Sequence, residues 1–152
     1  MAGRLLGIAV KARTRAPMSV RSHAALDAQT GLDGDWRGRM DGRQVTVLFE
    51  DDWARACAAV GERMPWTRRR ANLYVGGIAN PRAPGGMLRI GETVLEVTGE
   101  TEPCSRMDQE AAGLRRALEP EWLAGVTCRV VRGGTLRLED PVTLETAGMG
   151  AA

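Results

Sequence analysis

A chain of 152 residues, 43% of them hydrophobic and 26% charged, has the size and composition of one globular domain, which excludes a disordered or fibrous chain. Its formal net charge of +2 is too small to indicate a nucleic-acid or membrane-surface partner. No apolar run approaches the ~20 residues that cross a bilayer. We therefore expect a single domain over residues 1–152, with no nucleic acid and no membrane as partner.

The first predicted strand covers residues 4–10, a short apolar run that Lys11 follows. The run is too short for a secretory signal and lacks a small-residue cleavage site, so we interpret it as structure. Residues 44–49 give a stronger strand signal because they are rich in β-branched side chains.

An alanine-rich helix is predicted over residues 53–60. Asp51 or Asp52 is expected to cap its N-terminus, and Gly61 stands where the helix would stop. Cys57 falls inside this helix, so we interpret its thiol as a packing group.

Further short segments with β patterns are separated by glycine and proline turn signals. They cover residues 72–78, 87–90, 93–98, 128–131, 135–138 and 142–144. About eight short strands at this spacing predict a mainly β fold with inserted helices, an α+β barrel or sandwich.

Residues 106–123 change to a helical pattern, in which one apolar stripe keeps a three-to-four residue spacing. The stripe consists of Met107, Ala111, Leu114 and Leu118. Pro120 is expected to end this helix, and a short turn follows it.

Cys104 stands between Pro103 and the expected start of that helix. A thiol there lies near partial positive charge and free N–H groups, which favours the thiolate, a nucleophile and soft-metal ligand. Ser105 and Asp108 have the spacing of a capping box. The alternative is a small buried hydrophobe, as most free cysteines are.

Cys57, Cys104 and Cys128 are an odd number of cysteines at wide spacings, which fits neither a disulfide framework nor a C-x-x-C site. A reducing compartment, the cytoplasm, is the expected location. The sequence leaves open whether Cys128 lies near Cys104, where a second thiol would resolve a persulfide or close a disulfide.

Three consecutive arginines, residues 68–70, precede the strand at residues 72–78, and Asn72 lies at its start. Their guanidinium groups suit an anionic ligand, and the Asn72 amide can donate and accept hydrogen bonds. The alternative is a solvated charge run. Asp33 and Asp35 lie in a glycine-punctuated stretch, where turn formation is the default interpretation.

The order of these segments resembles the MOSC domain, the module named for the C-terminal part of molybdenum-cofactor sulfurases. The resemblance rests on residues 31–35, 43–48, 70–73, 77–78, 88–99, 103–104 and 124–142, and covers roughly residues 4–144. It implies a MOSC-type β-barrel that binds the molybdenum cofactor (molybdopterin).

The same resemblance implies roles for particular residues. Cys104 would ligate molybdenum or carry a transferable sulfur, since a soft thiolate is a suitable donor. Arg70 and Asn72 would hold the phosphate or pterin end of the cofactor, with Arg69 and Arg106 as secondary candidates. Asp35 matches the acidic position of a Gly-Asp motif and would orient the site.

The chain also departs from the family pattern. Members often carry a basic residue or histidine directly after the Gly-Asp pair, whereas Trp36 and then Arg37 stand here. Lys11 is the only lysine, and we do not expect it to form a Schiff base with pyridoxal phosphate. No cysteine cluster for an iron–sulfur centre is present.

Two functional classes remain open at this point. The first is an enzyme that reduces N-hydroxylated small molecules at a Cys104-ligated molybdenum, with electrons from another protein. The second is a sulfur carrier with a persulfide on Cys104, supplied by a sulfur donor protein, or a cofactor-handling module without small-molecule turnover. A barrel that binds neither group is a third alternative.

Overall fold

The computed structural model describes residues 3–147, and the ends of the predicted domain, residues 1–2 and 148–152, lie outside the described residues. The strands are β1 (Gly3–Val10), β2 (Ser19–Arg21), β3 (His23–Asp27), β4 (Gly31–Leu32), β5 (Val45–Phe49), β6 (Leu73–Gly76), β7 (Met87–Ile90), β8 (Thr93–Glu100), β9 (Val126–Arg132), β10 (Gly134–Arg137) and β11 (Pro141–Glu145). The α-helices are α1 (Glu50–Val60), α2 (Arg106–Glu110) and α3 (Leu114–Leu118), and the 3-10 helices are η1 (Trp36–Arg39), η2 (Trp66–Arg69) and η3 (Pro120–Trp122).

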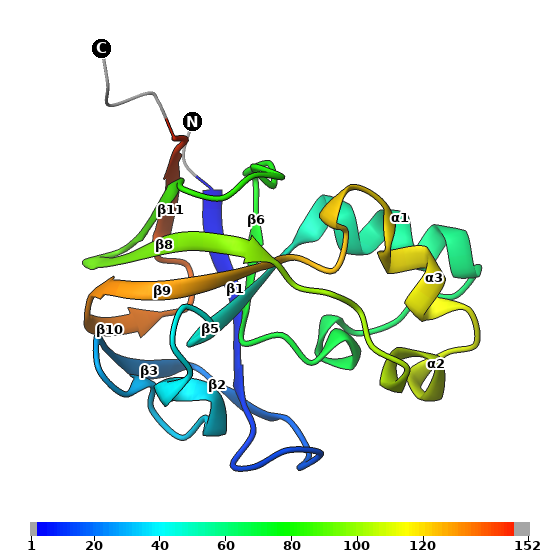
Figure 1. Cartoon of the computed structure of the whole chain (residues 1–152), viewed down its shortest axis with the longest axis horizontal. Helices are drawn as coiled ribbons and strands as arrows, with labels where there is room; N and C mark the ends of the chain where they lie inside the picture. The colour runs from blue at the N-terminus through cyan, green and yellow to red at the C-terminus, as the bar shows by residue number, and fades with distance from the viewer. Residues whose placement is uncertain (1–2, 148–152) are drawn as a thin grey trace.

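The predicted fold class, mainly β with inserted helices, is confirmed. Strands β11, β7, β8, β9, β5, β6 and β1 follow one another in a hydrogen-bonded sheet that closes on itself where β1 pairs with β11. The strand pairs are antiparallel except for β5 and β6, which run parallel because α1 forms the crossover between them. Figure 1 shows the barrel on one side and α1, α2 and α3 gathered on the other.

Every predicted strand is present, with ends shifted by at most two residues. Strands β2, β3 and β4 were not predicted. Strand β2 is fully exposed and β4 has two residues, so neither has an alternation of buried and exposed side chains to detect. Strand β3 does alternate, but two of its residues are alanines, which have low β propensity.

The core has two parts, which meet along β5. Val45, Val47 and Phe49 face the barrel interior, while Leu48 packs with the helices. This position explains why β5 is buried on both faces and has a continuous apolar sequence. Cys57 belongs to the helical part, as predicted.

Helix α1 begins at Glu50, earlier than predicted, and Phe49 is its N-cap without a side-chain hydrogen bond. The prediction of Asp51 or Asp52 as the cap is therefore wrong. The helix follows β5 directly, and Asp52 instead accepts hydrogen bonds from Asn80 and Arg82. Gly61 ends the helix in the left-handed conformation (φ 80°), as predicted.

The helix predicted from Arg106 to Pro120 is broken into two short pieces, and the short turn expected after it is η3. Ala111 is extended and Gly113 is left-handed (φ 84°), which separates α2 from α3. The capping box is also wrong, because Ser105 makes no side-chain cap and Asp108 accepts a hydrogen bond from the backbone N–H of Arg115. The apolar stripe is nevertheless buried in the helical part of the core.

Gly7 allows η2 to lie against β1. A Cβ atom at Gly7 would stand 2.5 Å from Cζ2 of Trp66, and the Trp66 ring stacks on Tyr74 with centroids 5.3 Å apart. Trp66 is the first residue of η2, and Arg69 is its last. The close approach of backbone and indole therefore sets the position of the arginine segment.

We expect Gly7→Ala to lower the free energy of unfolding by about 1–3 kcal/mol, because the added methyl group overlaps the Trp66 ring. Gly99→Ala in β8 is the matched control, since its nearest neighbour would be Thr127 Oγ1 at 3.8 Å. Urea unfolding of both variants measures the difference. Equal stabilities of the two variants would contradict the proposed contact.

Candidate functional site

Two neighbouring cavities open where the barrel meets the helical part. We call them together the cation cleft, because five residues line both cavities: Lys11, Arg37, Arg70, Cys104 and Arg106. These residues come from the end of β1, from η1, from the end of η2, from the segment between β8 and α2 and from the first position of α2. The fold thus brings together groups that are far apart in the sequence.

The smaller cavity, of about 220 Å³, is called the inner cavity because its further lining includes the buried residues Thr46, Arg69 and Met107. Thr101, Glu102 and Pro103 complete its wall. The larger cavity, of about 460 Å³, is called the outer cavity, because its further lining is exposed. That lining consists of Thr14, Arg15, Trp36, Ser105 and Gln109.

Cys104 is exposed and lies on the wall that the two cavities share. Helix α2 has five residues, so its dipole is small, and the nearby positive charge comes mainly from arginines. Arg70 and Arg106 share both cavities with Cys104, and Arg69 shares the inner one. The thiol therefore lies on a cavity wall and is not a buried packing group.

Cys128 is fully buried among the apolar side chains of the barrel and lines neither cavity. Burial raises the pKa of its thiol far above the usual range. Cys57, Cys104 and Cys128 are all free thiols. Cys128 is thus closed off from solvent and is not placed to react with a group on Cys104.

Arg69 is a buried cation with an unfilled hydrogen-bonding position. Its side chain is 6% exposed, and Nε donates a hydrogen bond to the carbonyl oxygen of Ala124 at 2.7 Å. Burial, together with the charge of Arg37, lowers the pKa of Arg69 to about 10, against the opposing effect of Cys104. The guanidinium group therefore stays charged at neutral pH.

Arg70 follows Arg69 in the left-handed conformation (φ 65°), which turns its side chain into the cleft. Its guanidinium group donates a hydrogen bond to the carbonyl oxygen of Ala16, in the loop after β1. Burial and the neighbouring Arg106 lower the pKa of Arg70. Its side chain is thus held beside Cys104 and Arg106.

Three buried side-chain nitrogen or oxygen atoms among residues 3–147 lack a hydrogen-bond partner, and all belong to residues of the inner cavity. They are Nη2 of Arg69, Oγ1 of Thr101 and Nε of Arg106. An unsatisfied buried group costs about 1–3 kcal/mol, and more when it is charged. Three such groups around one cavity indicate a wall suited to a ligand rich in hydrogen-bond acceptors.

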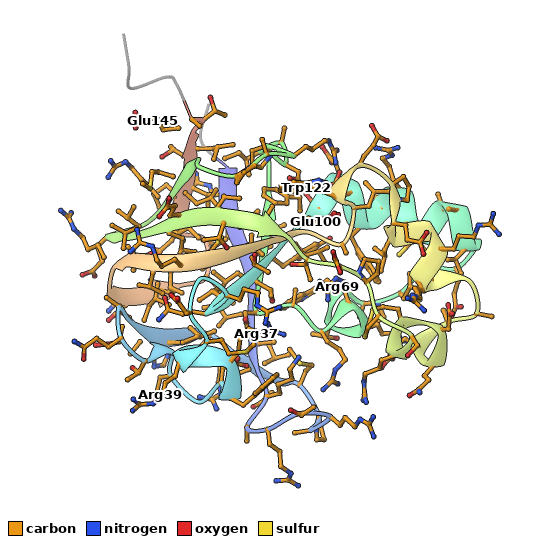
Figure 2. All side chains as sticks on the ribbon, in the orientation of Figure 1. Arg37, Arg39, Arg69, Glu100, Trp122 and Glu145 are labelled. Atoms are coloured by element: carbon orange, nitrogen blue, oxygen red, sulfur yellow. The ribbon has the colours of Figure 1, made fainter. Side chains whose placement is uncertain are left out.

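Figure 2 shows Arg37 and Arg69 near the junction of the barrel and the helices, and Arg39 at the outer edge of the molecule. Arg37 and Arg39 both belong to η1, so the turn of this short helix directs one arginine to the cleft and the other to solvent. Arg39 is therefore a suitable control position for Arg37.

Asn72 and Asp35, predicted as site residues, lie behind the cleft and line neither cavity. The Asn72 side chain accepts hydrogen bonds from the backbone N–H and hydroxyl of Thr46 and donates to the carbonyl oxygen of Ala9. Asn72 thus ties β1, β5 and β6 together where Thr46 faces the inner cavity. The oxygen and the nitrogen of its amide are therefore both hydrogen-bonded within the protein.

Asp35 caps η1 and accepts hydrogen bonds from the backbone N–H groups of Lys11 and Arg37, at 2.9 and 3.1 Å. Both partners line the cleft. The carboxylate therefore fixes the backbone from which two cations extend.

Lys11, Arg37 and Thr101 are cleft residues that the sequence did not identify. Lys11 directly follows a predicted strand, and Arg37 follows the Gly-Asp pair, but only the pairing of η1 with the end of β1 shows that they meet. Burial, together with Arg70 and Arg37, lowers the pKa of Lys11 from 10.5 to about 8, while Asp35 acts in the opposite direction. The cleft therefore holds one amine that titrates near neutral pH.

No group of three or more His, Cys, Asp or Glu side chains suited to a metal ion occurs within residues 3–147. A metal in the cleft would have to bring most of its ligands with it. The described helices include none with the length and hydropathy of a membrane-spanning segment.

The sequence profile of the MOSC domain matches residues 34–143, most of the chain, and the chain belongs to this family. The family is associated in general with the molybdenum cofactor. No curated protein matches the sequence.

Solved structures share the fold at low sequence identity. The YuaD protein from Bacillus subtilis superposes with a TM-score of 0.80 at 17% identity, over 95% of this chain and 96% of that one. YiiM from Escherichia coli gives 0.70 at 15% identity, over 94% of this chain and 70% of that one. YiiM from Geobacillus stearothermophilus gives 0.70 at 16% identity, over 98% and 76% of the two chains. These identities show a common fold alone.

We expect the single lysine to titrate with a midpoint of about 8 in the folded protein and near 10.5 in urea. Between these values the unfolded chain binds the extra proton, so this residue contributes stability that increases as the pH rises through the window. Carbon-13 NMR of ε-labelled lysine measures both midpoints.

Arg37→Met should raise the folded midpoint, because Arg37 repels the ammonium group, whereas Arg39→Met should leave it unchanged. A folded midpoint equal to the value in urea would show that Lys11 lies outside the cleft in solution.

Proposed function

We propose that the cation cleft holds the molybdenum cofactor and that the thiolate of Cys104 ligates the metal. The observation that carries this proposal is the set of three unpartnered buried polar atoms around the inner cavity, two of them on arginines. Guanidinium groups and a hydroxyl suit a phosphate and the polar edge of a pterin, because charge-assisted hydrogen bonds are the strongest of their kind.

The donor set of the cleft fits this cofactor. A thiolate suits a soft or borderline metal, and a metal already bound to an organic ligand needs few protein ligands. Cys104 is the cysteine on the cleft wall, and Arg69, Thr101 and Arg106 have donors left for the anionic end. Asp35 and Asn72 act from behind, by holding the backbone of η1 and the β1–β5–β6 junction.

The reaction we propose is the reduction of N-hydroxylated small molecules. When bound, the cofactor supplies oxygen-atom transfer at the metal. The chain supplies orientation and a positive field, through Lys11, Arg37 and Arg70, and an outer cavity of about 460 Å³ beside the thiol. The electrons come from a separate donor protein, because the chain has no cysteine cluster for an iron–sulfur centre.

A sulfur carrier is the second candidate, and the exposure of Cys104 favours it. A persulfide on Cys104 would be accessible to a donor protein and to an acceptor, while the buried Cys128 would not resolve it. In either case the free thiols Cys57, Cys104 and Cys128 support a reducing compartment, the cytoplasm.

Metal and pterin analysis separates the two candidates. Protein purified from a molybdenum-sufficient host should contain about one molybdenum per chain and release a fluorescent pterin on oxidation. Cys104→Ser should lose most of the metal, while Cys57→Ala, which changes a cysteine outside the cleft, should keep it. Reduction of N-hydroxylaminopurine with an added reductase then tests the reaction.

A sulfur carrier would instead show one extra sulfur on Cys104 by intact mass and no molybdenum. Wild-type protein with neither molybdenum nor labile sulfur would contradict both candidates, and retention of the metal in Cys104→Ser would contradict the proposed ligand.

A further inference from the structure

We propose that the outer cavity is the substrate subsite and that it selects planar aromatic compounds carrying a carboxylate or phosphate. This inference deepens the function proposed above, on which it rests for the reaction. The charge, the flat surface and the hydrogen-bonding groups of the outer cavity support it.

The charged side chains that line the outer cavity are all cationic. Its wall contains five cationic side chains and no carboxylate: Lys11, Arg15, Arg37, Arg70 and Arg106. The carboxylate of Asp35, which lines neither cavity, accepts hydrogen bonds from the backbone N–H groups of Lys11 and Arg37, while Glu102 lines only the inner cavity. Mutual repulsion of these cations is relieved by an anionic guest, and a cationic substrate is disfavoured.

The flat surface is the indole of Trp36. Its side chain is 37% exposed, although large aromatic groups usually pack inside. Its backbone N–H donates a hydrogen bond to the carbonyl oxygen of Lys11, and the guanidinium of Arg37 lies 5.4 Å from the ring centroid. An exposed ring held in place beside cations is suited to stack on an aromatic ring that carries negative charge.

The remaining wall is neutral and polar. Thr14, Ser105 and Gln109 offer hydroxyl and amide groups, and Cys104 stands where the outer cavity meets the inner one. A planar ligand lying on Trp36 thus has its edge near the thiol that we propose as metal ligand. Two of these residues, Arg15 and Trp36, line only the outer cavity. Substitutions at these two positions therefore test substrate binding without changing the wall of the inner cavity, where we propose that the cofactor binds.

Calorimetric titration with three probes tests the inference on the purified protein. 2-Naphthoate is flat and anionic, 2-naphthamide is flat and neutral, and cyclohexanecarboxylate is anionic and not flat. We expect naphthoate to bind about tenfold more tightly than either other probe, because it alone makes both kinds of contact.

Trp36→Ala should weaken naphthoate binding about fivefold to tenfold and leave cyclohexanecarboxylate unchanged, while Trp36→Phe restores most of the loss. Arg15→Ala should weaken both anions, and Arg39→Ala, which removes an outward-facing arginine of η1, should weaken neither. Equal binding of naphthoate and naphthamide, no binding of any probe, or a Trp36→Ala variant that binds like the wild type would overturn the inference.

The titrations, together with the molybdenum content, distinguish failure of this inference from failure of the proposed function. Naphthoate that binds with the expected Trp36 dependence to protein without molybdenum supports the subsite while the cofactor proposal fails. Protein that contains molybdenum but does not discriminate among the probes overturns the subsite alone.

Discussion

The burial of Arg69 is the constraint on which the site depends. A guanidinium group taken out of water must recover its hydrogen bonds. Arg69, which lines the inner cavity, recovers one from the carbonyl oxygen of Ala124, while its buried Nη2 has no partner. Replacing a buried charge by a hydrophobic side chain is often neutral or stabilising, so such a group is poor evidence of stability alone. Its retention at a cavity wall agrees with use in binding.

Small features of the sequence produce the geometry that buries Arg69. Gly7 leaves room for Trp66 against β1, Trp66 begins η2, and η2 ends at Arg69, between the barrel and the helices. The left-handed conformation of Arg70 then turns the next side chain into the cleft. The sequence of this segment is typical of a solvated charge run. In the fold, however, Arg69 is buried and Arg70 is half-buried.

The cations of the cleft also link stability to binding. Burial lowers the pKa values of Lys11 and Arg69. Repulsion by Arg70 and Arg37 lowers that of Lys11 further, and repulsion by Arg37 lowers that of Arg69 further. A bound anion reduces this repulsion and stabilises the folded state by an amount that grows with the logarithm of its affinity and concentration. A cofactor with a phosphate group would therefore contribute to the stability of the protein that holds it.

The sequence predicted the strands well, because β-branched runs between turn residues give a strong local signal. It also placed Cys104, Arg69, Arg70 and Arg106 in one site, and the structure brings these four residues to one cleft. The capping box at Ser105 and the long helix failed, because the extended Ala111 and left-handed Gly113 break the chain into pieces that pack separately.

Three residues of the cleft were not predicted: Lys11, Arg37 and Thr101. They reach the cleft because η1 is hydrogen-bonded to the end of β1 and because the chain after β8 is hydrogen-bonded to Gly125. Neither of these long-range contacts has a signal in the local sequence. Asn72 was predicted to hold the cofactor, and its amide is instead engaged with Thr46 and Ala9. A polar residue at the start of a strand has the same sequence pattern whether it binds a cofactor or holds neighbouring strands together.

A crystal structure of the protein purified with its cofactor tests the central claim most directly. The account predicts a phosphate or pterin oxygen within hydrogen-bonding distance of Arg69 Nη2, Thr101 Oγ1 and Arg106 Nε, with the metal on Cys104 Sγ. A cofactor bound elsewhere, with these three atoms satisfied by water alone, would contradict it.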